Sequence, residues 1–161
     1  MNKKEISILV TYNFWANQHL LKACERLSTN EFIREVTPDP GWGSLRGILV
    51  HIMDAEYGWR SKYDSDVLFA PTFADVAAVS SRWSEEEEKW FEYLAELPEE
   101  TLNKVIDMGG QRRIRVWQAI VHIVNHGTQH RGEAAALLTG YGQSPGELEF
   151  DLFLSENPQY I

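Results

Sequence analysis

Residues 116–130 read Val-Trp-Gln-Ala-Ile-Val-His-Ile-Val-Asn-His-Gly-Thr-Gln-His, which places a histidine at every fourth position: His122, His126 and His130. A four-residue step differs from one full α-helical turn by about 40°, so the three rings would share a slowly rotating stripe. Neighbouring members of such a stripe lie roughly 5–6 Å apart at Cβ, and two imidazoles at that separation can bind one metal ion. The spacing predicts a helix over Val116–Thr139 that carries a metal-binding pair. The alternative is a polar histidine face, or core histidines that are each bonded to a neighbour.

The residues around these histidines are mostly apolar. A ring on such a helix lies in a low dielectric, which favours the neutral form that binds metal. Gly127 and Gly132 suggest close approach of another helix, although ordinary packing would also account for them. A zinc protease would carry Glu after the first histidine of the pair, whereas His122 precedes Ile123 and His126 precedes Gly127.

The composition narrows the class of protein. A chain of 161 residues predicts a single domain over 1–161. The 24 acidic and 15 basic residues leave a net charge of −9, which argues against a nucleic-acid partner. A single cysteine, Cys24, excludes an internal disulfide, and we expect it to be a small buried residue. No signal peptide or apolar run of membrane-spanning length is recognisable, so we expect no membrane association and a cytoplasmic location.

The hydrophobic periodicity predicts an all-α fold with four long helices. The helices are expected at Met1–Leu27, Ser44 to about Tyr63, Thr72 to about Leu97, and Val116–Thr139, with Ser44 and Thr72 as N-caps. Residues 28–43 form a connection, residues 99–115 resemble a short hairpin around Gly109-Gly110, and a short helix is expected at about Glu149–Glu156.

Three further expectations concern packing. Within the third long helix, Trp83, Trp90, Phe91 and Leu94 should pack inward, whereas the run Glu85–Glu88 should face solvent. Near the C-terminus, Leu148, Phe150, Leu152 and Phe153 can close one end of the core. The arginines at 112, 113 and 115 could bind an anion, but a solvent-facing strand accounts for them better.

His51 is the natural third ligand, because a second packed helix can complete a three-imidazole site and leave one position open. Asp54 and Glu56 can orient its ring or face water. His19 is interpreted as a surface or capping histidine.

Three segments together resemble the DinB/YfiT-like family of metalloenzymes, over nearly the whole chain. They are Tyr12–Asn17, Leu49–Ile52 and His122–Gly132, of which the last is the most specific. The resemblance implies a four-helix bundle in up-down-down-up order and a divalent nickel or zinc ion held by His51, His126 and His130. It implies that His122 supports the site or the fold rather than binding the ion.

The resemblance also implies a chemistry. Some family members transfer a low-molecular-weight thiol to an electrophile, and we expect such a metal-dependent transferase here. The alternatives are a metal-dependent hydrolase, for which His122 is a candidate acid or base, and a non-catalytic protein that binds a metal or ligand as a dimer. Six Trp and seven Phe, together with the resemblance, predict a homodimer that buries an apolar patch.

Overall fold

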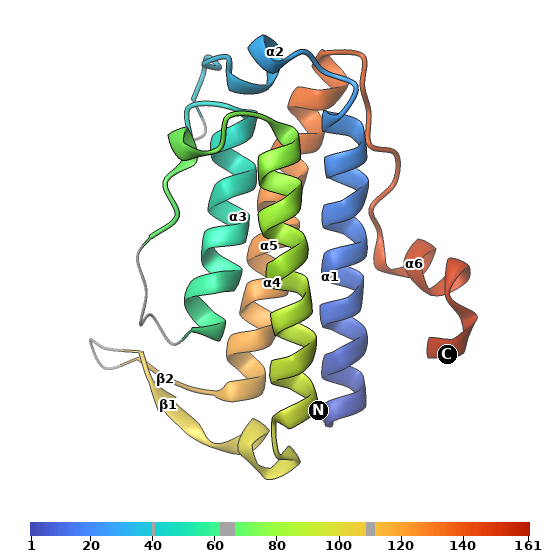
Figure 1. The fold of residues 1–161 in the computed structure, drawn as a ribbon. Coiled ribbons are helices and arrows are strands. Elements are labelled where there is room, and N and C mark those ends of the chain that lie inside the picture. The colour runs from blue at the N-terminus through green and yellow to red at the C-terminus, as the bar shows by residue number, and fades with distance from the viewer. Residues whose placement is uncertain (40, 62–66, 109–111) are drawn as a thin grey trace.

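The computed structural model describes residues 1–39, 41–61, 67–108 and 112–161. Four long helices lie side by side (Figure 1): α1 (Lys3–Cys24), α3 (Leu45–Arg60), α4 (Val76–Glu96) and α5 (Val116–Gly140). The shorter elements are α2 (Thr29–Ile33), η1 (Ala70–Thr72), η2 (Glu99–Asn103), β1 (Val105–Asp107), β2 (Arg113–Arg115), α6 (Phe150–Glu156) and η3 (Pro158–Tyr160). The predicted all-α fold is confirmed. The described part of the chain holds no helix that is both long and apolar enough to cross a membrane.

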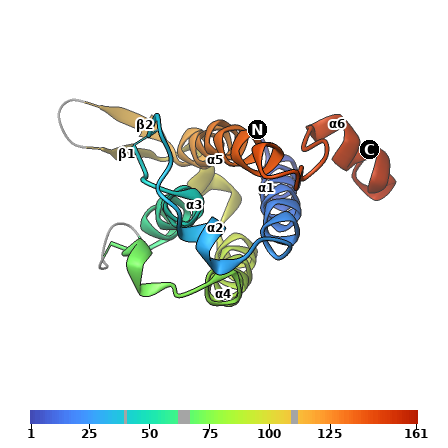
Figure 2. The same ribbon diagram turned by 90° about the horizontal axis from the view of Figure 1, so that it is seen from above.

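The four long helices enclose one core. In Figure 1, α1 and α5 run upward while α3 and α4 run downward. Helix α5 contacts α1 and α3, and α4 contacts the other sides of the same two helices, so the four surround a common axis when seen from above (Figure 2). The most buried large side chains of this core include Trp83, Phe32, Ile48, Leu49 and Met53.

The helix boundaries follow their caps, and one predicted cap is wrong. Ser44 caps α3 as predicted, with its hydroxyl accepting from the Gly47 N–H. Helix α4, however, begins at Val76, because the Asp75 carboxylate accepts from the Ala78 N–H. Thr72 instead lies in η1 and donates its hydroxyl to the Phe69 carbonyl. An extended aspartate satisfies free N–H groups of a first turn as well as threonine does.

Two other boundaries differ from expectation. Helix α1 ends at Cys24 rather than Leu27. Helix α3 ends at Arg60, and Tyr63 lies outside the described residues. The connection over residues 28–43 also contains the one-turn helix α2, with a capping box between Ser28 and Glu31. Its Phe32 is fully buried, so this turn covers one end of the core.

The two strands of the predicted hairpin are present. Strands β1 and β2 pair antiparallel with Ile106 opposite Ile114, and the Gly109-Gly110 turn lies outside the described residues. Arg112, Arg113 and Arg115 are exposed, as expected for a solvent-facing strand.

Part of the expected packing of α4 is wrong. Trp83, Trp90 and Leu94 are buried, but Phe91 is 36% exposed and lies at the edge of the core against Phe14. Glu86, expected in solvent, is fully buried. It binds the Arg60 guanidinium at 2.5 and 2.9 Å and Arg82 at 3.4 Å, so a pair of cations compensates its buried charge.

The C-terminal segment packs on a flank of the bundle rather than closing one end. Helix α6 lies beside α1 in both views (Figures 1 and 2). Phe153 is buried with Tyr12, Ala16 and Val124 in a separate small cluster, while Phe150 is 37% exposed. The Tyr12 hydroxyl donates to the Leu148 carbonyl at 2.8 Å and holds the tail on the bundle.

A buried polar network joins the four long helices. Glu56 of α3 accepts from Asn13 and Asn17 of α1, at 2.6 and 2.9 Å, and from the Trp83 indole of α4 at 2.6 Å. Arg131 of α5 donates to the side-chain oxygens of the same two asparagines at 2.6 and 2.9 Å. The network fixes the helices against one another, because an unpaired member would be costly in so low a dielectric.

Candidate metal centre

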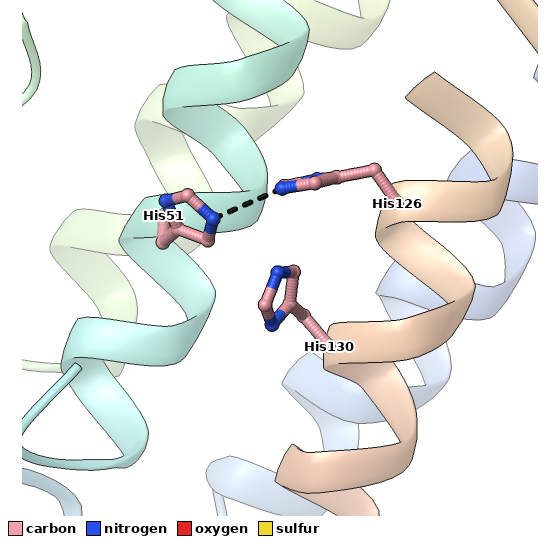
Figure 3. A group of neighbouring side chains, drawn as sticks. All are labelled: His51, His126 and His130. Carbon is pink, nitrogen blue, oxygen red and sulfur yellow. Dashed lines mark hydrogen bonds between the residues drawn. The ribbon is translucent and has the colours of Figure 1, made fainter. Parts of the chain in front are cut away.

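Three imidazoles converge between α3 and α5 (Figure 3). His51 comes from α3, and His126 and His130 come from successive turns of α5. One ring nitrogen of each residue lies within 4.8 Å of the others. His51 Nε2 and His126 Nε2 lie 2.9 Å apart. The i, i+4 spacing on one helix and a single position on the facing helix are therefore sufficient to build the cluster.

The environment keeps two of these rings neutral. Burial, together with the charges of the neighbouring His126 and His130, lowers the pKa of His51 to about 4. Burial likewise lowers the pKa of His126 to about 4, with His130 and His122 as additional causes. Both rings are therefore unprotonated at neutral pH, and their nitrogen lone pairs are free to bind a cation.

Glu133 orients the ring of His130. Its Oε2 lies 2.8 Å from His130 Nδ1, a distance at which Nδ1–H donates to the carboxylate. This tautomer leaves Nε2 as the free lone pair. Sequence reasoning considered Asp54 and Glu56 for such a role and missed Glu133, although its i, i+3 spacing from His130 places it on the same helical face.

Neither earlier carboxylate candidate contacts a ring of the cluster. Asp54 accepts from the Leu68 N–H at 2.7 Å and holds the segment before η1. Glu56 belongs to the buried network, where burial raises its pKa to about 7 despite the donors from Trp83, Asn13 and Asn17. Both carboxylates are thus bonded to partners outside the cluster.

Trp42 was also missed, and it covers the ring of His51. The two rings stack with centroids 3.4 Å apart and planes 13° apart, and Trp42 meets His130 edge-on at 5.7 Å. The loop that carries Trp42 is held by Asp39, whose Oδ1 accepts from the N–H groups of residues 41, 42 and 43. Gly47 is required beneath it, because a Cβ there would lie 1.7 Å from the Trp42 carbonyl oxygen.

The other two histidines lie outside the cluster. His122 is exposed, with its ring centroid 6.1 Å from that of His126 and 5.8 Å from that of Trp59. His19 packs against Trp15, with centroids 4.3 Å apart. The structure thus brings together the three residues that the family resemblance implied and separates His122 from them.

The donor set fits a divalent metal ion. Two nitrogens each about 2.1 Å from one tetrahedral ion lie about 3.4 Å apart, so the 2.9 Å approach of His51 and His126 needs only a small adjustment. The His126 Nδ1 atom is buried without a hydrogen-bond partner among the described residues. Neutral imidazoles suit nickel and zinc, and the donors alone do not choose between the two.

Comparison with known proteins places the chain in a family. Residues 1–159 match the family model described as the DinB family. The chain is 27% identical to Protein DinB of Bacillus subtilis (strain 168), over 92% of this chain and 94% of that protein.

Two solved structures show the same fold at low sequence identity. A DinB-like protein from Bacillus subtilis is 16% identical with a TM-score of 0.64, covering 84% of this chain and 92% of that one. A conserved protein from Enterococcus faecalis is 16% identical with a TM-score of 0.59, covering 82% and 94%. Because the family model matches residues 1–159 of its 161 residues, this chain belongs to the DinB family.

Proposed function

We propose that this protein is a metal-dependent enzyme that transfers a low-molecular-weight thiol to an electrophile. His51, His126 and His130 would hold the ion, nickel or zinc. The observation that carries the proposal is the composition of the cluster. Among the described residues it consists of three histidines, with no cysteine and no carboxylate as a fourth member.

A three-histidine set favours a catalytic over a structural role. Structural zinc sites are usually closed by four protein ligands and rich in cysteine, whereas catalytic sites keep a position open. The one cysteine, Cys24, is buried elsewhere, and burial raises the pKa of its thiol to about 12. An ion bound at the three imidazoles would take up a thiol as its thiolate, which supplies a nucleophile at neutral pH.

The protein's own residues would keep the donors in place. Trp42 fixes the plane of His51 by stacking, and Glu133 fixes the tautomer of His130. In the transfer, the new carbon–sulfur bond forms as the bond from carbon to the leaving group breaks. The leaving group takes that electron pair, and the thiol proton passes to water. The reaction therefore needs no general base, which agrees with the absence of Glu after His126.

A hydrolytic reaction would make a further demand on the site. Activation of water calls for a nearby acid or base. The sequence candidate, His122, is exposed, with its ring 6.1 Å from that of His126. Thiol transfer is therefore the better match to the geometry.

The test combines metal analysis with turnover. Elemental analysis of the purified protein should find about one divalent ion per chain, and a panel of small thiols with monobromobimane should show transfer above the spontaneous rate. His126→Ala should lose both the metal and the activity, whereas His122→Ala, one turn away on the same helix, should retain the metal.

Three results would each contradict part of this proposal. Wild-type transfer by the metal-free His126→Ala protein would exclude the metal mechanism. A metal-loaded protein that transfers no thiol would favour the alternative of a non-catalytic dimer that binds a metal or ligand. Light scattering would then show whether the protein is a dimer. Loss of metal in His122→Ala would show that the ligand set is wrong.

A further inference from the structure

The buried polar network connects the two helices that carry the histidine cluster. One end of it is Glu56 of α3, which follows His51 by five residues, a rise of about 7.5 Å along the helix. The other end is Arg131 of α5, which directly follows His130. Both helices are therefore fixed to this network close to the side chains that would bind the metal.

The connection between the two ends passes through two asparagines of α1. The Nδ2 groups of Asn13 and Asn17 donate to Glu56 Oε1 at 2.6 and 2.9 Å. Their Oδ1 atoms accept from Arg131 Nη1 at 2.6 and 2.9 Å. Because a carboxylate only accepts and a guanidinium only donates, the orientation of both amides is fixed. These four side chains, called the relay below, are each at most 2% exposed.

The relay spans the width of the bundle. Helices α1 and α3 lie across the core from each other, and each of them packs against α4 and α5 (Figure 2). The apolar burial that holds the four helices together has no preferred direction. Hydrogen bonds to charged groups are strong, and they weaken steeply when the donor angle or distance changes. The relay is therefore suited to set the positions of the helices along the bundle axis.

The α5 end of the relay is fixed to the segment between two of the metal-binding histidines. A Cβ at Gly127 would lie 2.6 Å from Arg131 Nη1, so the guanidinium lies over the α5 backbone next to His126. Arg131 Nη2 also donates to the Thr128 hydroxyl at 2.8 Å. Both of these contact positions lie between His126 and His130 in the sequence. A displacement of the guanidinium would therefore act directly on the turn that carries these two rings.

The α3 end of the relay has partners on α4 as well. Glu56 Oε2 accepts from the Trp83 indole at 2.6 Å, and the Glu56 carbonyl accepts from the Trp90 indole at 3.2 Å. If Asn13 were replaced, Glu56 would keep these bonds and its bond from Asn17. A change at Asn13 therefore loosens the relay without leaving a buried charge unpaired.

We propose that Asn13 and Asn17 are positioning residues for the metal site. They hold α3 in register with α5 and so bring His51 opposite His126 and His130. Helix α1 would then influence how tightly the ion is bound, although it supplies none of the three imidazoles. A functional site needs its first-shell groups held to within about 0.5 Å, and a polar side chain buried between packed helices can fix their register. The inference rests on the metal site of the proposed function and does not require thiol transfer.

The test measures zinc affinity by competitive chelator titration of the whole chain. Asn13→Leu keeps a similar side-chain volume and removes one bridge of the relay. It should lower the zinc affinity by about 2- to 30-fold, the range found for residues that couple distant parts of a protein. Asn17→Leu removes the other bridge and should lower the affinity within the same range. It serves as the second variant if Asn13→Leu does not fold.

Glu86→Gln is the control for a general loss of stability. Glu86 is fully buried, and its cationic partners Arg60 and Arg82 lie on α3 and α4 rather than on α5. Its replacement should destabilise the fold at least as strongly as Asn13→Leu, because it leaves two cations without their carboxylate. It should nevertheless keep the zinc affinity within about twofold of the wild type, as expected for independent sites.

A second measurement uses the effect of zinc on unfolding. A ligand that binds only the folded chain raises the unfolding midpoint according to its affinity. At the same zinc concentration, the midpoint should therefore rise less in Asn13→Leu than in Glu86→Gln. A purely structural role for Asn13 would lower the starting midpoint and leave the rise unchanged.

The outcomes separate this inference from the proposed function. Wild-type zinc affinity in both asparagine variants would overturn the positioning role, and so would an equal loss of affinity in Glu86→Gln. If the wild type bound zinc no better than His126→Ala, the metal site would be wrong, and the inference would fall with it. Zinc binding that depends on His126 without any thiol transfer would refute the proposed reaction and not the positioning role, which zinc affinity alone decides.

Discussion

Gly127→Ala should destabilise the bundle even though alanine is the better helix former. A Cβ at this position would lie 2.6 Å from Arg131 Nη1 and 2.8 Å from Asn13 Oδ1. Arg131 is 2% exposed and donates to Asn13 and Asn17 at 2.6 and 2.9 Å, so its guanidinium cannot withdraw without breaking those bonds. Two bonds to a charged group are worth about 3 to 6 kcal/mol, and the alanine returns about 1 kcal/mol of helix propensity. The expected net loss is about 2 to 5 kcal/mol.

Gly132→Ala provides the matched control on the same helix. A Cβ at Gly132 meets nothing within 4 Å, so this variant should gain about 1 kcal/mol. Circular dichroism should follow thermal and urea unfolding of both variants. The thermal midpoint of Gly127→Ala should be about 4 to 20 °C below that of the wild type, and the midpoint of Gly132→Ala should be slightly above it. A Gly127→Ala protein as stable as Gly132→Ala would refute the argument that Arg131 is locked in place.

Three other perturbations follow from the same structure. Glu133→Gln weakens the hydrogen bond that orients the His130 ring. It should reduce zinc affinity by about 10- to 100-fold in a competitive chelator titration. An equal loss of zinc affinity in Glu147→Gln, an exposed control, would contradict this role of Glu133. Glu86→Gln leaves Arg60 and Arg82 without their buried carboxylate. It should lower the free energy of unfolding by about 3 kcal/mol. Glu85→Gln, at the exposed neighbouring position, should change that free energy by less than about 0.5 kcal/mol. Burial raises the pKa of Cys24 from 9.0 to about 12, so the folded chain retains a proton that the unfolded chain releases above pH 9. The stabilisation is present below pH 9 and is lost as the pH rises toward 12. Compared with Cys24→Ala, the wild type should lose about 1 kcal/mol between pH 8 and pH 10 in urea titrations, and an identical pH dependence in the two proteins would contradict the buried thiol.

The histidine site was predictable in part. The i, i+4 spacing placed three imidazoles on one face of α5, but it did not choose a pair, because His122, His126 and His130 are equivalent under helical periodicity alone. The choice implied by family resemblance matches the rings that converge. The structural reason is register: α3 brings His51 opposite His126 and His130, while Trp59 lies beside His122.

The errors share one physical cause. Glu86 was expected in solvent, and Glu56 was considered for the site. When only the neighbouring sequence is known, a carboxylate is expected to be either exposed or functional. Both are instead buried against partners from other helices: Arg60 for Glu86, and Asn13, Asn17 and Trp83 for Glu56. Such compensation depends on residues tens of positions away in the chain.

The sequence by itself determined the four long helices, the strands of the hairpin and the helical face on which the histidines lie, because periodicity and spacing are local properties of the backbone. The tertiary structure alone decided which histidines meet, and that Trp42 and Glu133 fix their rings. These features depend on how whole helices pack and in what register. That packing is set by the summed burial of the core and its internal polar network, which no single segment encodes.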